Sequence, residues 1–367
     1  MLLPVPEEEF AMGTQSLRAI AAIRNPEPNL TASTGFAVVR PRKVNPDYLS
    51  HVLTSRYFVE SVVSVSTGVS YPATNPGDLM NLLVPIPPAD EQESIANFLD
   101  GEIARIDNLI AKKRELIERL KEKRTALISH VVTKGLPPEE AAKHGLPVNP
   151  PLKPSGVPWL GDIPEHWETL DLKYIASVND DDWPETTAPD TEVLYVDIGS
   201  VDGTNGIREK EVMIFENAPS RARRRVRDGD IIVSTVRTYL RAIAPIREPE
   251  PNLTVSTGFA VVRPQKADPD YLAQVLTTHY FVESVVSIST GVSYPATNPN
   301  DLMNLVIPLP PTKEQIAISE FLVIQCSKID QLVGLERSLI EKLQEYRSAL
   351  ITAAVTGKID VSSGKVS

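Results

Sequence analysis

Hydrophobic and polar positions along this chain follow one pattern that occurs twice. Each time, a stretch with short apolar runs leads into a long segment whose apolar residues recur at alternating intervals of three and four. In the first long segment, residues 91–134, these positions are Ile103, Ile106, Ile110, Ile117, Leu120, Leu127 and Val131. The spacing predicts a long helix with one apolar stripe sustained over about four heptads.

The second long segment, residues 312–356, repeats the stripe. Its seam positions are Ile329, Val333, Ile340, Leu343, Leu350 and Ala354. Because both stripes are long and in the same register, they favour a paired coiled coil over two independent surface helices. Lys113 occupies a seam position near the midpoint of the first helix, and in an antiparallel pair we expect it to approach Glu336. These opposite charges favour pairing within one chain and disfavour a pair of two first helices.

The repeat is also visible residue by residue. Residues 26–88 return as residues 249–311, a shift of 223 positions (249 − 26), with 13 mismatches in 63 aligned positions. A period this long is not that of a solenoid, whose repeats span about 20–50 residues. The sequence therefore predicts a duplicated unit, in which a compact domain is followed by a long helix.

Shorter elements inside each copy follow from local signals. In the first copy, Gly35–Arg40 is apolar and β-branched and predicts a strand, and Asn45-Pro46 predicts the start of one helix with an apolar face from Leu49 to Val62. A further strand is expected at Leu82–Ile86. The second copy predicts strands at Val193–Ile198, Glu211–Phe215, Asp230–Val236 and Gly258–Arg263.

The two copies differ in what precedes them. Residues 159–236 come before the second copy and have no counterpart in the first, and residues 1–13 match nothing there. The expected fold is α+β, with two lobes, the first one partial, joined by two long helices. The expected domains are a partial first domain (1–90), a helix (91–134), a proline-rich linker with neither helix nor sheet (135–158), a complete second domain (159–311), a second helix (312–356) and a tail (357–367).

Composition narrows the class of protein. A length of 367 residues fits two domains. The single cysteine, Cys326, excludes a disulfide framework, and neither a metal site nor a cofactor is expected. No apolar run approaches the length of a membrane span, so a cytoplasmic protein without membrane contact is predicted. The net charge of −11 argues against indiscriminate coating of nucleic acid, although a local basic face is compatible with it.

Such a basic face is predicted in the second domain. Seven arginines fall within the 21 residues 221–241: Arg221, Arg223, Arg224, Arg225, Arg227, Arg237 and Arg241. Guanidinium groups bind phosphates and guanine edges in bidentate fashion, so the cluster favours contact with nucleic acid. The alternative is a set of surface ion pairs with the acidic residues of segment 180–192.

Three polar loops are further candidates for contact with DNA, because hydroxyl groups bind phosphates and tyrosine can stack. Their candidate residues are Thr238 and Tyr239 beside Arg237, then Ser289, Thr290, Ser293 and Tyr294, and in the first copy Thr67, Ser70 and Tyr71. Ordinary turn chemistry is the competing explanation for these residues.

Several motifs together carry a family resemblance. They are the Trp159–Trp167 opening, the Ser289–Thr297 loop, the Asn298–Pro311 segment and Glu314-Gln315, with Ser66–Pro88 and Glu91-Gln92 in the first copy. In this combination the chain resembles the specificity subunit of type I restriction–modification systems. The resemblance implies two target-recognition domains that each read half of a split site in double-stranded DNA. It also implies two long helices paired antiparallel, and no catalytic activity in the subunit itself. Its implied partners are two methyltransferase subunits and the restriction–translocase subunits.

Two other functions are weighed against this one. The first is a truncated or regulatory scaffold that binds the methyltransferase subunit without reading DNA, since the first domain departs from the family pattern. The second is an enzyme. Asn149-Pro150-Pro151-Leu152 is similar to the signature of amino-methyltransferases, but that signature ends in an aromatic residue where Leu152 stands. No glycine-rich cofactor loop follows a strand elsewhere.

Overall fold

The computed structural model describes residues 9–13, 20–23, 27–66, 74–158, 160–202, 206–236, 242–291 and 295–361. The chain divides into two compact units, one of residues 1–118 with 333–367 and one of residues 119–332. Two long helices, α4 (Ala89–Lys134) and α9 (Thr312–Val355), each contribute a segment to both units. No helix of the described ranges is long and apolar enough to cross a membrane.

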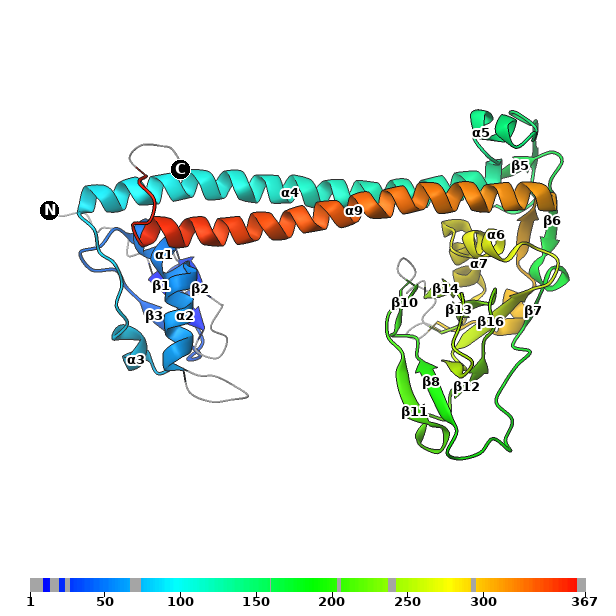
Figure 1. The fold of residues 1–367 in the computed structure, drawn as a ribbon, viewed down its shortest axis with the longest axis horizontal. Coiled ribbons are helices and arrows are strands. Elements are labelled where there is room, and N and C mark those ends of the chain that lie inside the picture. The colour runs from blue at the N-terminus through cyan, green and yellow to red at the C-terminus, as the bar shows by residue number, and fades with distance from the viewer. Residues whose placement is uncertain are drawn as a thin grey trace. The chain divides into compact units, whose positions relative to one another are not determined.

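The first unit contains a small lobe, here called the first lobe, made of the described residues between Glu9 and Pro88 (Figure 1). Its elements are β1 (Glu9–Gly13), β2 (Ile20–Ile23), β3 (Phe36–Val39), α1 (Pro46–Thr54), α2 (Arg56–Val65) and α3 (Pro76–Met80). The strands form an antiparallel sheet in the order β2-β1-β3. The apolar faces of the helices cover this sheet and form a core with Ala37.

Strand β1 occupies a position that the sequence repeat does not reveal. Phe10 lies opposite Ala22 and Val39. In the second unit, Ile231 lies opposite Pro245 and Val262, which are the repeat equivalents of those two partners (22 + 223 and 39 + 223). Backbone hydrogen bonds accept almost any side chain. Residues 9–13 therefore complete the sheet without resembling the strand that they replace.

The single helix expected after Asn45 is wrong, because two helices are present. The Asn45 side chain accepts a hydrogen bond from the Tyr48 amide, as the expected cap does. Ser55 then adopts an extended backbone (φ −66°, ψ 148°), and its hydroxyl accepts from the Phe58 amide at 3.2 Å. Ser55 thus ends α1 and caps α2, which turns the second apolar face into the same core.

The strand expected at Leu82–Ile86 is also wrong in the first lobe. Residues 82–86 have no regular secondary structure there. Their equivalents in the second lobe form β17 (Val306–Leu309), which pairs with β6 (Glu168–Asp171). A strand needs a partner for its ladder, and none of the first lobe's described residues takes the place of β6.

The second unit contains a larger lobe, here called the second lobe, made of residues 160–311. Its strands include β5 (Asp162–Pro164), β6, β7 (Ala176–Val178), β8 (Glu192–Val196), β9 (Val201–Asp202), β10 (Gly206–Ile207), β11 (Glu211–Ile214), β12 (Ala222–Arg225), β13 (Ile231–Ser234), β14 (Ile243–Pro245), β15 (Leu253–Ser256), β16 (Phe259–Pro264) and β17. Its helical segments are η1 (Leu172–Tyr174), η2 (Phe215–Asn217), α6 (Pro269–Leu276), α7 (His279–Ile288) and α8 (Pro299–Leu302). Two four-stranded sheets have the orders β11-β8-β15-β12 and β14-β13-β16-β7. The four strands expected in this lobe are confirmed to within two residues at their ends.

The proline-rich linker holds regular structure, contrary to expectation. Residues 138–143 form α5 (Pro138–Lys143), and β4 (Leu152–Pro154) pairs with β5. Proline is compatible with the first turn of a helix, where no amide donor is needed, and with the end of a short edge strand. A count of prolines therefore underestimates the structure of this segment.

Helices α4 and α9 pack against each other in both units and run in opposite directions (Figure 1). In the first unit, Arg347 pairs with Asp107 at 3.1 Å and Lys113 pairs with Glu336 at 2.7 Å. In the second unit, Arg124 pairs with Asp330 at 3.2 Å. The Arg124–Asp330 pair is the repeat equivalent of Arg347–Asp107 (124 + 223 and 107 + 223), so the same interhelical contact occurs once in each unit.

The junction between lobe and helices is likewise the same in both units. In the first unit, the Tyr48 hydroxyl donates to the carbonyls of Pro85 (2.9 Å) and Val355 (3.4 Å). In the second unit, the Tyr271 hydroxyl donates to the carbonyls of Pro308 (2.9 Å) and Val132 (3.5 Å). Each lobe is therefore fastened to the end of the helix that follows the other copy of the repeat.

Candidate nucleic-acid interface

The arginine cluster lies on and beside β12, an edge strand of the second lobe that pairs with β15. Successive side chains of a strand point to opposite faces. The ladder of β12 shifts its register between Ala222 and Arg224, so the contacts of the side chains decide which face each occupies. Arg223 and Arg225 lie against two rings that touch each other, whereas the Nε of Arg224 is buried. Segment 181–183 covers the free edge of β12, since the Trp183 amide donates to the Arg223 carbonyl at 2.8 Å.

Two arginines of this strand stack on aromatic rings. The Arg223 guanidinium lies 4.5 Å from the ring centroid of Phe215, and the Arg225 guanidinium lies 4.7 Å from that of Trp183. The two rings contact each other edge to face at 6.2 Å. Stacking holds the guanidinium planes in fixed orientations while leaving their in-plane N–H donors available.

Asp181 neutralises part of the cluster. Its carboxylate accepts from Arg227 Nε at 3.1 Å and from Arg227 Nη2 at 2.7 Å, and it lies 3.5 Å from Arg225. Ion pairs with the acidic segment 180–192 are therefore present, as the alternative interpretation of the sequence expects.

Arg224 has a different environment from its neighbours. Burial lowers the pKa of its guanidinium, and the Asp182 carboxylate acts in the opposite direction. The buried Nε of Arg224 has no hydrogen-bond partner among the described residues. Its inward position makes Arg224 a poorer candidate for contact with DNA than the arginines on the outer face.

Arg221 and Arg227 are the exposed members of the described cluster, and of these two only Arg221 has no ion-pair partner among the described residues. The Arg221 carbonyl accepts from the Thr257 amide at 2.8 Å, at the turn between β15 and β16. In the same turn, the Gly258 carbonyl accepts from the Thr235 amide at 2.9 Å. Arg221 thus lies at the end of the lobe where β13 ends.

The loop of residues 289–297 meets the same end of the lobe. Ala296 forms an isolated β-bridge with Val236, at the end of β13, and another with Thr290. The two candidate loops of the second lobe therefore leave adjacent points of the fold. Thr290 is exposed, whereas the Ser289 hydroxyl lies 2.6 Å from Thr297 Oγ1 and donates to the Val285 carbonyl at 2.7 Å. Ser289 thus has a structural role at the end of α7.

Several candidate residues lie outside the described ranges. These are Arg237, Thr238, Tyr239, Arg241, Ser293 and Tyr294 in the second lobe and Thr67, Ser70 and Tyr71 in the first. Their contact with DNA stays a prediction. Trp183 and Phe215, which orient the arginines, were missed because each is an isolated aromatic residue in the sequence.

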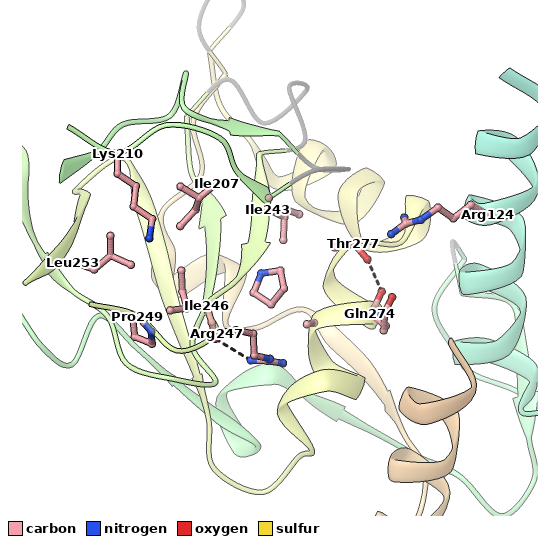
Figure 2. Close-up of a pocket in the computed structure, with 13 residues that line it drawn as sticks. Arg124, Ile207, Lys210, Ile243, Ile246, Arg247, Pro249, Leu253, Gln274 and Thr277 are labelled. Atoms are coloured by element: carbon pink, nitrogen blue, oxygen red, sulfur yellow. Dashed lines mark hydrogen bonds between the residues drawn. The ribbon is translucent and has the colours of Figure 1, made fainter. Parts of the chain in front are cut away.

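A concave site of about 440 Å³ lies between the second lobe and α4 (Figure 2). It is lined by Arg124, Lys210 and Arg247 together with apolar residues such as Ile246. Each of these three cations has a carboxylate partner, namely Asp330, Glu250 and Asp270. The site therefore carries little uncompensated charge. No group of three or more acidic, histidine or cysteine side chains that could hold a metal ion occurs in the described parts of the chain.

Comparison with known proteins shows which proteins this chain is similar to. A family model described as the type I restriction modification DNA specificity domain matches residues 7–119. The putative type I restriction enzyme MjaX specificity subunit of Methanocaldococcus jannaschii is 26% identical over 336 residues, which cover 89% of this chain and 71% of that relative. The MjaVIII specificity subunit of the same organism is 24% identical over 344 residues, covering 91% of this chain and 75% of the relative. Over most of its length, this chain is similar to type I specificity subunits.

Solved structures of type I systems share the fold. One chain, from work on complex assembly and conformational transition of the type I R-M system, has a TM-score of 0.67 at 19% identity, covering 96% of this chain and 84% of that one. The HsdS subunit from Thermoanaerobacter tengcongensis has a TM-score of 0.51 at 21% identity, covering 96% and 81%. These two solved structures support the mixed helix-and-sheet architecture with two lobes and two long helices.

Proposed function

We propose that this chain is the DNA-sequence-recognition subunit of a type I restriction–modification complex, without catalytic activity of its own. The observation that carries the proposal is the outer face of β12. There, aromatic rings orient two arginines. Arg221 is exposed at the same end of the lobe as the bridge between Val236 and Ala296. Guanidinium groups with fixed orientation can bind phosphates or the edges of bases in a groove.

The family suggests the partners. Type I specificity subunits act in complexes, so double-stranded DNA, methyltransferase subunits and restriction subunits are the proposed partners, with two methyltransferase subunits per chain. The second lobe would read one half of a split DNA target. The equivalent loop of the first lobe would contact the other half.

Salt-dependent binding to duplex DNA tests this function. Each phosphate contact that is lost lowers the slope of log K against log salt by about 0.9. Replacing Arg221 with alanine should weaken binding and lower the slope by about one such step. Arg337→Ala removes an equal charge from the exposed surface of α9 and serves as the matched control. Equal slopes for the two variants would contradict a role of Arg221 in DNA binding.

The scaffold alternative also has a supporting observation, since Asp181 pairs with two arginines of the cluster. A scaffold of this kind would bind the methyltransferase subunit with normal affinity and would show no steep salt dependence with any duplex. Measuring both affinities on the same preparation separates the two functions.

A further inference from the structure

The two lobes share most of their sequence but differ at one position in the fold. In the second lobe, residues 168–178 run as a strand, a turn and a second strand between β16 and β17. The strand β6 pairs with β17, and β7 pairs with β16. Leu172 and Ile175, in the turn between them, are 0% and 1% exposed. The segment is therefore an integral part of that lobe's core.

The same position in the first lobe is an open groove of about 630 Å³. One wall is the end of β3 with residues 40–44, and the other wall is residues 79–86. These walls are the repeat equivalents of β16 and β17. Among the described strands, β3 lies at the edge of its sheet. The groove thus lies between β3 and the chain segment equivalent to β17, at the position that a peptide segment fills in the second lobe.

Apolar side chains along this groove are exposed only in the first lobe. Met80 is 69% exposed, whereas its equivalent Met303 is 5% exposed. Ile86 is 54% exposed, whereas its equivalent Leu309 is partly buried in the ladder with β6. Exposed apolar surface next to an unpaired strand edge is typical of a binding site for an extended peptide.

Backbone groups in the groove also lack hydrogen-bond partners among the described residues. In the second lobe, the amides of Leu172 and Lys173 donate to the carbonyls of Leu305 and Met303, both at 2.9 Å. The first-lobe equivalents of these carbonyls belong to Leu82 and Met80, and neither accepts a hydrogen bond from a described residue.

The facing wall shows the same difference. The Ile175 carbonyl accepts from the amides of Gln265 (2.9 Å) and Lys266 (3.1 Å). The equivalent amides, of Arg42 and Lys43, have no acceptor within the described chain. The side chains of Arg42 and Lys43 also line the groove and bring positive charge to it. An occupant with acidic residues, like Glu168 and Asp171 of the second lobe, would complement this charge.

We propose that the groove of the first lobe is an acceptor site for a strand–turn–strand segment of the type formed by Glu168–Val178, supplied by a separate polypeptide. A second copy of this chain is a poor donor, because Leu172 and Ile175 of its segment 168–178 are already buried in its own second lobe. The donor is instead a polypeptide with two apolar anchors at the spacing of Leu172 and Ile175, preceded by acidic residues. Binding would proceed by addition of strands to both walls.

A synthetic peptide of residues 166–180, labelled with fluorescein, tests the proposal with the full-length chain. We expect saturable binding in fluorescence anisotropy, in the micromolar range, because main-chain bonds and two buried anchors offset the cost of ordering a short peptide. The peptide with Leu172→Asp and Ile175→Asp should not bind. Peptide binding should also slow hydrogen exchange at the amides of Arg42 and Lys43.

Variants of the chain locate the binding site. Met80→Asp should weaken binding at least tenfold, and because Met80 is largely exposed the variant should fold. Ile86→Asp provides a second test in the same groove, because Ile86 lines it and is 54% exposed. Val63→Asp is the matched control, since Val63 is 52% exposed and its equivalent Val286 is 40% exposed, so neither lobe covers this position.

Three results would overturn the proposal. The first is absence of peptide binding, and the second is equal binding by the Met80→Asp variant. The third is a concentration-dependent dimer of the chain, lost in Met80→Asp, which would assign the groove to a second copy. None of these results depends on binding to DNA, so the recognition function is tested separately.

Discussion

Lys113 Nζ donates a hydrogen bond to Glu336 Oε2 at 2.7 Å, and the two residues are separated by 223 positions, the shift that relates the two copies of the repeat. Their side chains are 20% and 18% exposed. A residue of one helix thus contacts its own equivalent on the other, as expected near the midpoint of an antiparallel pair. Duplication of one helix sequence supplies a pair of opposite charge at this point because the two copies have diverged there.

Charge reversal tests the energetic role of this contact. Lys113→Glu and Glu336→Lys should each lower the free energy of unfolding by about 1 kcal/mol, because each places like charges in contact in a partly buried seam. The double reversal should restore most of the loss in urea unfolding. The exposed pair of Glu102 and Arg105, which lies within α4, provides a control cycle with weaker coupling. The two single losses of unfolding free energy can be added to give the loss expected for the double variant without any contact. A double variant that is no more stable than this sum would contradict direct contact in solution.

Asp181 is expected to restrain binding to DNA. Asp181→Asn removes the carboxylate that pairs with Arg225 and Arg227. If these guanidinium groups can then reach phosphates, duplex affinity should rise, and the salt slope should steepen by up to about 2 × 0.9. Asp171→Asn changes the net charge equally, at a site paired with Lys173, and controls for the global effect. Weaker binding by Asp181→Asn would mean that the carboxylate positions the arginines for DNA instead of competing with it.

The thiol of Cys326 should be unreactive in the folded chain. Cys326 occupies a seam position of α9, and burial raises the pKa of its thiol. Because the thiolate is the nucleophile, a raised pKa lowers the reactive fraction at neutral pH. Alkylation by iodoacetamide, followed by mass spectrometry, should be much slower in the native chain than in urea. Equal rates in the two conditions would show that the helix pair opens around this position.

Gln315 should be important for the stability of the second lobe. Its side chain accepts from the Asp268 amide at 2.8 Å and donates to the Pro310 carbonyl at 2.8 Å, in a buried site. Gln315→Ala leaves both backbone groups unsatisfied and should lower the free energy of unfolding by about 2–4 kcal/mol.

The equivalent Gln92 makes the same two bonds in the first lobe, to the Asn45 amide and the Pro87 carbonyl, so Gln92→Ala should have a similar effect there. Gln331→Ala, on the exposed surface of α9, should be nearly neutral in the same unfolding measurement. A similar loss for all three variants would assign the effect to helix propensity instead of the buried hydrogen bonds.

Local signals and repetition made most elements predictable. The heptad positions and the caps at Asn45 and Asp268 depend on residues a few positions apart, and the structure has them as expected. Strand pairing is not local. The same sequence signal that gives β17 in the second lobe gives irregular chain at residues 82–86, because a ladder also requires its partner strand.

The candidate interface was predictable in place but not in detail. The density of arginines located the cluster, but no strand was predicted at residues 222–225, and nothing in the sequence distinguished Arg224 from Arg223 and Arg225. Of the two rings that orient these arginines, Phe215 precedes β12 by seven residues and Trp183 by 39. Tertiary contacts, such as those of Asp181, therefore decide which guanidinium groups remain available for binding DNA. The spacing of residues in the sequence does not predict such contacts.

Each lobe is attached to the helix that follows the other copy of the repeat. This determines the order in which the two attachments can form during synthesis. The second lobe is fastened to Val132, which has already been made when Tyr271 appears. The first lobe is fastened to Val355, which follows Tyr48 by 307 residues. At a translation rate of about 5–20 residues per second, roughly 15–60 s pass between the synthesis of Tyr48 and that of Val355. During this time the apolar surface of the first lobe is accessible to chaperones and proteases. The half of the molecule that is translated first is therefore the last to be secured.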